Sequence, residues 1–207
     1  FRQRFQQILN RGTMIKDLLK SLPEHKKYLE TLQGKELYVV DWKDENNTGI
    51  SFSDCDLGRP AVCLHNPYEL SVCCDKFPEN ALPVKKGCFS QQCECVLFPA
   101  DSIDDDNIWV LFVETKYAKD EFKARDIRNK YPEKMIKQIE ATVSYFRNKG
   151  ILRDDKMVYA IVSFPFLANF NAWFDQNLLF EAWVEHRIMV RATNHAEILS
   201  NERIRLL

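Results

Sequence analysis

The pattern of apolar and polar positions along the chain predicts helices that alternate with short strands. Apolar residues recur every three or four positions, as in amphipathic helices, over residues 13–22, 132–149 and 171–186. Runs rich in β-branched and aromatic residues, typical of strands, cover residues 36–42, 89–98, 108–117 and 157–164. Weaker strand signals lie at residues 48–52, 60–64, 69–74, 187–191 and 204–207. This order predicts an α/β fold with a central mixed β-sheet flanked by helices.

Turn and capping residues divide the less regular parts of the chain. Residues 2–10 are expected to form a short helix of their own. Pro23 interrupts or restarts the next helix, whose apolar face continues to Leu32, and Gly34 is a plausible stop. Residues 118–130 are highly charged and are expected to be helical or loop-like before Pro132 begins the long helix.

The chain is long enough for one ordinary α/β domain, and we expect residues 1–207 to form a single domain. Its core is expected over about 20–165. Residues 43–87 are rich in polar residues, glycine and proline and are predicted to be an insertion, where loops often carry substrate contacts. Residues 166–207 form a C-terminal extension, whose aromatic side chains either pack in the core or make an interface with a partner.

The most informative stretch is a predicted hairpin centred on an acidic turn at residues 101–107. Its second strand is apolar at every position from Ile108 to Val113, which is typical of a strand covered on both faces. That strand ends in Glu114-Thr115-Lys116, and alternation places Glu114 and Lys116 on one face. Charged groups at the end of a buried strand are costly unless they are paired or used in chemistry.

A second acid is expected to lie beside this pair. Glu94 stands between Cys93 and Cys95 on the first strand of the hairpin, and alternation predicts both thiols on the opposite face from the carboxylate. If the two strands pair antiparallel, Glu94 and Glu114 reach a common site. Two carboxylates beside an amine favour Mg²⁺ or Mn²⁺ and the hydrolysis of a phosphodiester.

This pattern resembles the PD-(D/E)xK nuclease superfamily, also called restriction-endonuclease-like, whose core is an αβββαβ unit. The resemblance implies that Glu94, Glu114 and Lys116 are catalytic. It also implies that Glu94 and Glu114, with the Thr115 carbonyl, bind Mg²⁺ or Mn²⁺, while Lys116 positions the attacking water. Glu24 would be the additional helical glutamate that some members of the family place near the metal.

The sequence departs from the family pattern at the first acid, which is usually an aspartate that often follows proline. Asp101 lies two residues after Pro99 and is an alternative to Glu94, although it falls in the turn. The tripeptide spacing alone is not specific, because Glu24-His25-Lys26, Glu121-Phe122-Lys123 and Asp41-Trp42-Lys43 share it. The position of Glu114 and Lys116 after a buried strand and before a long helix is what favours them.

Charge is unevenly distributed although the net charge is only −1. Residues 116–156 carry twelve basic and seven acidic side chains, which suits a phosphate backbone and also suits an ordinary solvated surface. Lys119 and Lys123 are candidate contacts to nucleic acid on this segment. Gln138 on the long helix is expected either to hydrogen-bond a phosphate or to hold Lys116, by resemblance to RecB-like members of the family.

Composition places the chain among soluble proteins, with 45% hydrophobic and 29% charged residues. No apolar run is long enough to span a membrane and the first residues are too polar for a secretory signal, so we expect a cytoplasmic protein. The seven cysteines are then expected to be reduced thiols, with a structural zinc site as the alternative. A homodimer or a protein partner is compatible with these features.

The sequence therefore predicts a metal-dependent endonuclease or exonuclease that acts on DNA, with RNA as the second choice. Two alternatives keep the fold without the chemistry. One is an inactive nucleic-acid-binding module, and the other is a scaffold that uses the aromatic residues of 171–190 as its interface.

Overall fold

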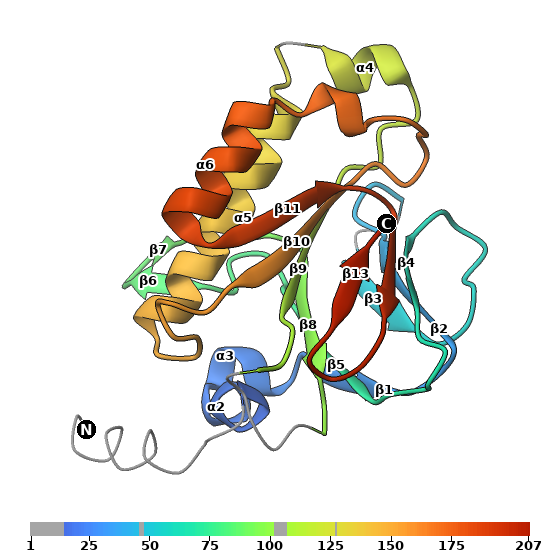
Figure 1. Ribbon diagram of the computed structural model, residues 1–207. Helices are drawn as coiled ribbons and strands as arrows, with labels where there is room; N and C mark the ends of the chain where they lie inside the picture. The colour runs from blue at the N-terminus through green and yellow to red at the C-terminus, as the bar shows by residue number, and fades with distance from the viewer. Residues whose placement is uncertain (1–14, 46–47, 102–106, 127) are drawn as a thin grey trace.

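In the computed structural model, which describes residues 15–45, 48–101, 107–126 and 128–207, two sheets and a group of helices form three layers (Figure 1). The predicted helix at residues 2–10 lies outside the described residues. The helices are α2 (Ile15–Ser21), α3 (Pro23–Lys26), α4 (Glu121–Arg125), α5 (Tyr131–Asn148) and α6 (Gln176–His186), with a 3₁₀ turn at Asn171–Trp173. The mixed α/β class with sheets of mixed strand orientation is confirmed.

The first sheet has six strands in the order β1-β5-β8-β9-β10-β11. Their bounds are Leu29–Leu32 for β1, Val72–Lys76 for β5, Cys95–Pro99 for β8, Leu111–Thr115 for β9, Val158–Ser163 for β10 and Ile188–Ala192 for β11. Strands β8 and β9 are antiparallel neighbours, so the predicted hairpin is confirmed. Strand β10 runs parallel to β9 after the α4–α5 crossover, also as predicted.

The second sheet has five strands in the order β13-β12-β4-β2-β3. Their bounds are Glu36–Asp41 for β2, Ile50–Ser53 for β3, Val62–His65 for β4, His195–Ile198 for β12 and Ile204–Leu206 for β13. A separate two-stranded hairpin pairs β6 (Pro83–Lys85) with β7 (Cys88–Phe89). The strand predicted at residues 36–42 is therefore present, but it belongs to this second sheet and not to the central one.

Burial on both faces explains why residues 111–113 of β9 are all apolar. Phe112 packs in the core beneath the helices, while Leu111 and Val113 pack in a second core between the two sheets. Helix α5 covers the first of these cores with a stripe of fully buried residues at the predicted positions: Met135, Ile136, Ile139, Val143 and Phe146. Figure 1 shows α5 and α6 side by side on the sheet face opposite the five-stranded sheet.

One prediction of secondary structure is wrong. The helix expected to continue from Pro23 to Leu32 ends at Lys26, and Leu29–Leu32 forms the edge strand β1, which pairs with β5. Pairing with β5 and the ion pair from Lys76 Nζ to Glu30 Oε2 at 2.6 Å override the local helical periodicity. Strand β5 overlaps the weaker strand signal at residues 69–74, within the predicted insertion at 43–87, and it is an interior strand of the six-stranded sheet.

His25 is a packed residue, as expected from the apolar face on which it lies. It is fully buried, and its Nδ1 lies 2.5 Å from Oδ2 of the equally buried Asp75. Phe77 and Phe146 contact the imidazole edge to face, with ring centroids 6.0 and 5.8 Å away. Burial raises the pKa of Asp75, and the bond to His25 opposes that rise. The pair thus fastens the short helix α3 to the end of β5.

Candidate active site

Glu94 and Glu114 lie side by side where the β8–β9 pairing ends. Cys95 pairs with Val113, and the Glu94 N–H donates to the Val113 carbonyl at 2.9 Å, which continues the ladder by one residue. Both carboxylates are buried: the Glu114 residue is 0% exposed and the Glu94 residue is 4% exposed. The predicted juxtaposition of the two acids is therefore present in the structure.

The flanking thiols do not follow the predicted alternation. Cys93 packs in the core beneath the helices, whereas Cys95 packs in the core between the sheets, so the prediction that they share a face is wrong. Regular strand geometry begins only at Cys95, and the chain before it follows a different path. All seven cysteines are free, and four of them, Cys73, Cys74, Cys93 and Cys95, are buried.

Each carboxylate has its own lysine partner. Lys116 Nζ donates to Glu114 Oε1, as the shared face of the two residues predicts. Lys43 Nζ, which comes from the other sheet, lies 2.5 Å from Glu94 Oε2. The Lys116 and Lys43 side chains are 25% and 33% exposed, so each ion pair joins a buried carboxylate to a partly exposed lysine.

The sequence interpretation missed the contribution of the segment at the end of β2. Asp41, the last residue of β2, is buried and raises the pKa of both Lys43 and Lys116. Its effect on Lys43 is smaller than that of Glu94, and its effect on Lys116 is smaller than those of Glu114 and Glu94. The tripeptide Asp41-Trp42-Lys43 has the same acid-x-lysine spacing as Glu114-Thr115-Lys116, and it also lies at the end of a strand. This repeated spacing beside a strand is the feature of the sequence from which the contribution of Asp41 and Lys43 could have been predicted.

A set of contacts around Tyr117 holds the β2 segment against the end of β9. The Tyr117 hydroxyl accepts from the Asp41 N–H at 3.2 Å and donates to the Pro60 carbonyl at 3.0 Å. The Arg59 guanidinium lies 4.1 Å from the centre of the Tyr117 ring and also pairs with Asp44 and Glu45. Cation–π and ionic contacts therefore fix the position from which Lys43 reaches Glu94.

Burial and the charges of neighbouring groups together raise the pKa of each ionisable group in the site: Glu94, Glu114, Lys43 and Lys116. Burial raises the pKa of Glu114 to about 8, with Lys116 opposing the rise and Glu94 adding to it. Burial also raises the pKa of Glu94, with Lys43 opposing and Asp41 adding. Burial disfavours the charged forms of both lysines, but the neighbouring acids outweigh it and raise the pKa of each. The lysines therefore stay protonated at neutral pH.

Helix α5 fixes the segment that carries Glu94. The Gln138 Nε2 donates to the Gln92 carbonyl at 2.8 Å, and the Cys93 N–H donates to the Thr142 hydroxyl at 2.9 Å. Thr142 in turn donates to the Gln138 carbonyl at 2.8 Å. Gln138 therefore holds the main chain two residues before Glu94, and its contact with nucleic acid stays a prediction.

Thr142→Val should destabilise the protein by about 1–2 kcal/mol, because it leaves the buried Cys93 N–H without an acceptor. Thermal unfolding of Thr142→Val and of Thr142→Ser measures this, since serine keeps the hydroxyl. Equal destabilisation by both variants would mean that the hydrogen bond contributes nothing.

The other predicted site residues lie apart from this cluster. Asp101 is exposed and follows β8 at the end opposite Glu94, so it does not join Glu114. Glu24 accepts from the Tyr145 hydroxyl at 3.2 Å. Lys119 lies 5.6 Å from the centre of the Phe166 ring, and Lys123 is exposed on α4. Thr115 adjoins Glu114 in the chain, and the predicted role of its carbonyl stays a prediction; its side chain is buried, with the hydroxyl unpaired among the described residues.

The two carboxylates of the site are its candidate ligands for a divalent ion. In the part of the chain that the structure describes, no group of three or more His, Cys, Asp or Glu side chains is arranged to hold a metal. Two carboxylates are nevertheless enough for Mg²⁺, which keeps several waters and binds through one or two carboxylates plus substrate phosphate. Glu114 Oε2 is buried without a hydrogen-bond partner, and such an acceptor suits a cation.

Comparison of the chain with protein-family models, with curated proteins and with solved structures finds no match. Among the described helices, none is both long and apolar enough to cross a membrane. The function must therefore be argued from the site itself.

Proposed function

We propose that the chain is a divalent-metal-dependent nuclease of the PD-(D/E)xK type. The observation that carries the proposal is the meeting of Glu94, Glu114 and Lys116 at one end of the β8–β9 pair. The order of elements also supports it: α2 and α3, then β5, β8 and β9, then α5 and the parallel strand β10 follow the αβββαβ order of that superfamily.

The residues would divide the work of phosphodiester hydrolysis as follows. Glu94 and Glu114 would hold Mg²⁺ or Mn²⁺, which when bound polarises the phosphate and activates water. Lys116 keeps its proton beside Glu114, so its ammonium can hold an attacking water and stabilise the charge that develops on the phosphate oxygens. Lys43 would leave Glu94 free for the ion by turning toward a substrate phosphate.

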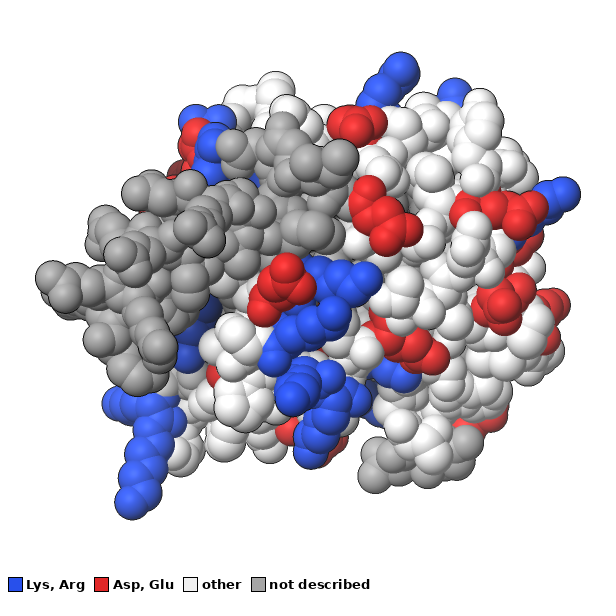
Figure 2. Space-filling view, turned by 90° about the horizontal axis from the view of Figure 1, so that it is seen from below, with Lys and Arg blue, Asp and Glu red and all other residues white. Residues whose placement is uncertain are grey.

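Nucleic acid is the favoured substrate because the groups that face solvent at the site are basic. The side chains of Lys43 and Lys116 are partly exposed, while the carboxylates of Glu94 and Glu114 are buried. The net charge of the chain is −1, and on the face that Figure 2 shows, Lys and Arg gather near the middle with Asp and Glu beside them. Local recognition at the site therefore fits better than unspecific coating of DNA.

A cleavage assay with purified protein tests the proposal. Single-stranded circular DNA, supercoiled plasmid and end-labelled linear DNA are incubated with Mn²⁺, Mg²⁺ or EDTA. We expect cleavage with either ion and none in EDTA, and the circular substrates separate endonuclease from exonuclease activity. Hydrolysis of bis(p-nitrophenyl) phosphate gives a readout that does not depend on a base or on a DNA groove. Absence of metal-dependent turnover with all of these substrates would refute the proposal.

A second candidate, an inactive binding module, is favoured by one observation. Both glutamates already have lysine partners, and such internally paired charges need no ligand. This module would bind nucleic acid in EDTA and would never cut it in Mn²⁺.

A further inference from the structure

Two hollows adjoin each other beside the candidate active site. The first has a volume of about 380 Å³ and lies between α5 and the segment before β8. The second has a volume of about 340 Å³ and lies against the end of β5. Both are lined by Lys43 and Glu79, so these two side chains mark the boundary between the hollows. Because Lys43 also contacts Glu94, the pair of hollows lies next to the proposed catalytic groups.

The first hollow presents hydrogen-bonding groups that the described protein does not use. Asn80, Gln91 and Lys134 line it, and within the described residues no hydrogen bond or ion pair joins their side chains to another group. Asn and Gln side chains offer a donor and an acceptor together, which matches the edge of a nucleic-acid base. Lys134 adds a positive charge to the lining that it shares with Lys43.

The second hollow has a different lining that complements the first. The half-buried ring of Tyr28 lines it, and Lys76, which is paired with Glu30, provides a further cation. An aromatic face beside basic side chains is typical of surfaces on which single-stranded bases stack. The two hollows thus offer base-edge contacts on one side of Lys43 and a stacking ring on the other.

We propose that this groove binds single-stranded nucleic acid, with one nucleotide in each hollow and the intervening phosphate at Lys43. The proposal rests on the nuclease function, because it makes the groove the substrate path to Glu94 and Glu114. Hollows of this volume lie near the lower end of small-ligand sites, which is on the order of 300 Å³, so each takes one unpaired base. Bases in a duplex are stacked and paired, and they cannot enter hollows of this kind.

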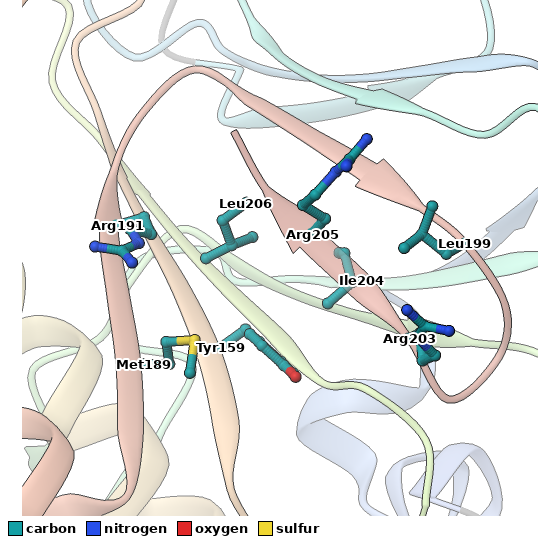
Figure 3. Close-up of a pocket in the computed structure, with 8 residues that line it drawn as sticks. All are labelled: Tyr159, Met189, Arg191, Leu199, Arg203, Ile204, Arg205 and Leu206. Atoms are coloured by element: carbon teal, nitrogen blue, oxygen red, sulfur yellow. The ribbon is translucent and has the colours of Figure 1, made fainter.

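A third hollow, of about 340 Å³, is the rival site and serves as the control (Figure 3). It lies between β10–β11 and β13 and includes Arg191, Arg203 and Arg205. Figure 3 shows Arg205 pointing away from Tyr159 and Met189, and Arg205 is paired with Glu197. None of the residues of the candidate active site lines this hollow, which disfavours it as the substrate path.

Fluorescence anisotropy of the whole chain in EDTA tests the groove without any cleavage. The probes are a fluorescein-labelled twelve-nucleotide deoxythymidine strand and a duplex of the same length. We expect the single strand to bind more tightly than the duplex. Tyr28→Ala should weaken binding about tenfold, whereas Tyr28→Phe should keep it because the ring remains. Lys134→Ala should weaken binding and reduce the slope against log salt by about 0.7, whereas Glu79→Gln should tighten it.

Several outcomes would overturn the inference. These are equal binding of strand and duplex, no binding of either, or loss of binding in Arg203→Ala with Lys134→Ala unaffected. Thermal unfolding of each variant checks that the protein is folded, and Tyr28→Leu, which also removes the aromatic ring, replaces Tyr28→Ala if the latter is not. Metal-dependent hydrolysis of bis(p-nitrophenyl) phosphate separates the two failures: if it persists while strand binding is absent, the groove is wrong and the nuclease chemistry stands.

Discussion

Glu114→Gln should reduce metal-dependent DNA cleavage by about a thousandfold or more while the protein stays folded. The substitution keeps the shape of the side chain but removes the charge of a proposed ligand and of the partner of Lys116. Loss of a group that stabilises transition-state charge in a buried site typically costs on the order of 10²–10³ in rate, and loss of a proposed metal ligand adds to this. Initial cleavage rates in Mn²⁺ on the single-stranded substrate measure the effect.

Matched variants test whether the loss of cleavage comes from this site and not from the removal of any acidic side chain. Glu94→Gln and Lys116→Ala should act like Glu114→Gln. Asp101→Asn and Glu24→Gln should keep wild-type rates, because these acids lie apart from the cluster. Full activity in Glu94→Gln together with loss in Asp101→Asn would assign the first acid to the turn and contradict the proposed site.

The part of the site that could be predicted from the sequence is the part that follows from strand geometry. A continuously apolar strand must be covered on both faces, so Glu114 and Lys116 at its end were expected to lie together at a sheet boundary. The antiparallel hairpin then brings Glu94 beside Glu114. Such inferences are local, since they depend on alternation within one pair of neighbouring strands.

The contribution of Lys43 could not be predicted in the same way. It depends on the packing of a second sheet against the first, and periodicity within β2 carries no information about that packing. The aromatic and ionic contacts that place it join Arg59 and Tyr117, which are 58 positions apart in the chain. An acid-x-lysine tripeptide after a strand is too common to select without the tertiary arrangement.

Strand β1 was mistaken for helix for a related reason. Residues 28–32 have an apolar spacing that fits a helix, but the edge of β5 provides a partner for a strand. Tertiary pairing commonly overrides weak local propensity. The same pairing places β5 inside the six-stranded sheet, although its sequence lies in a region rich in loop-forming residues.

The buried acid at the centre of the site should also make the metal-free protein less stable as pH rises. The pKa of Glu114 is about 8 in the folded protein and 4.5 is its ordinary value, so the folded state binds the proton more tightly. Its contribution to stability is fully present below pH 4.5 and is lost as pH rises toward 8. One pKa unit corresponds to about 1.4 kcal/mol, so a rise from 4.5 to about 8 corresponds to a loss of about 5 kcal/mol.

Glu114→Gln removes this titration because glutamine is neutral at every pH. In EDTA, the stability of Glu114→Gln relative to wild type should therefore rise between pH 4.5 and 8 and then level off. Urea unfolding at several pH values measures the difference, and Glu133→Gln, an exposed position on α5, provides the control with a flat profile. A Glu114→Gln difference that does not change with pH would mean that Glu114 is ionised throughout. A variant that is both more stable at pH 8 and inactive would indicate that the fold tolerates this buried carboxylate for the sake of its chemistry.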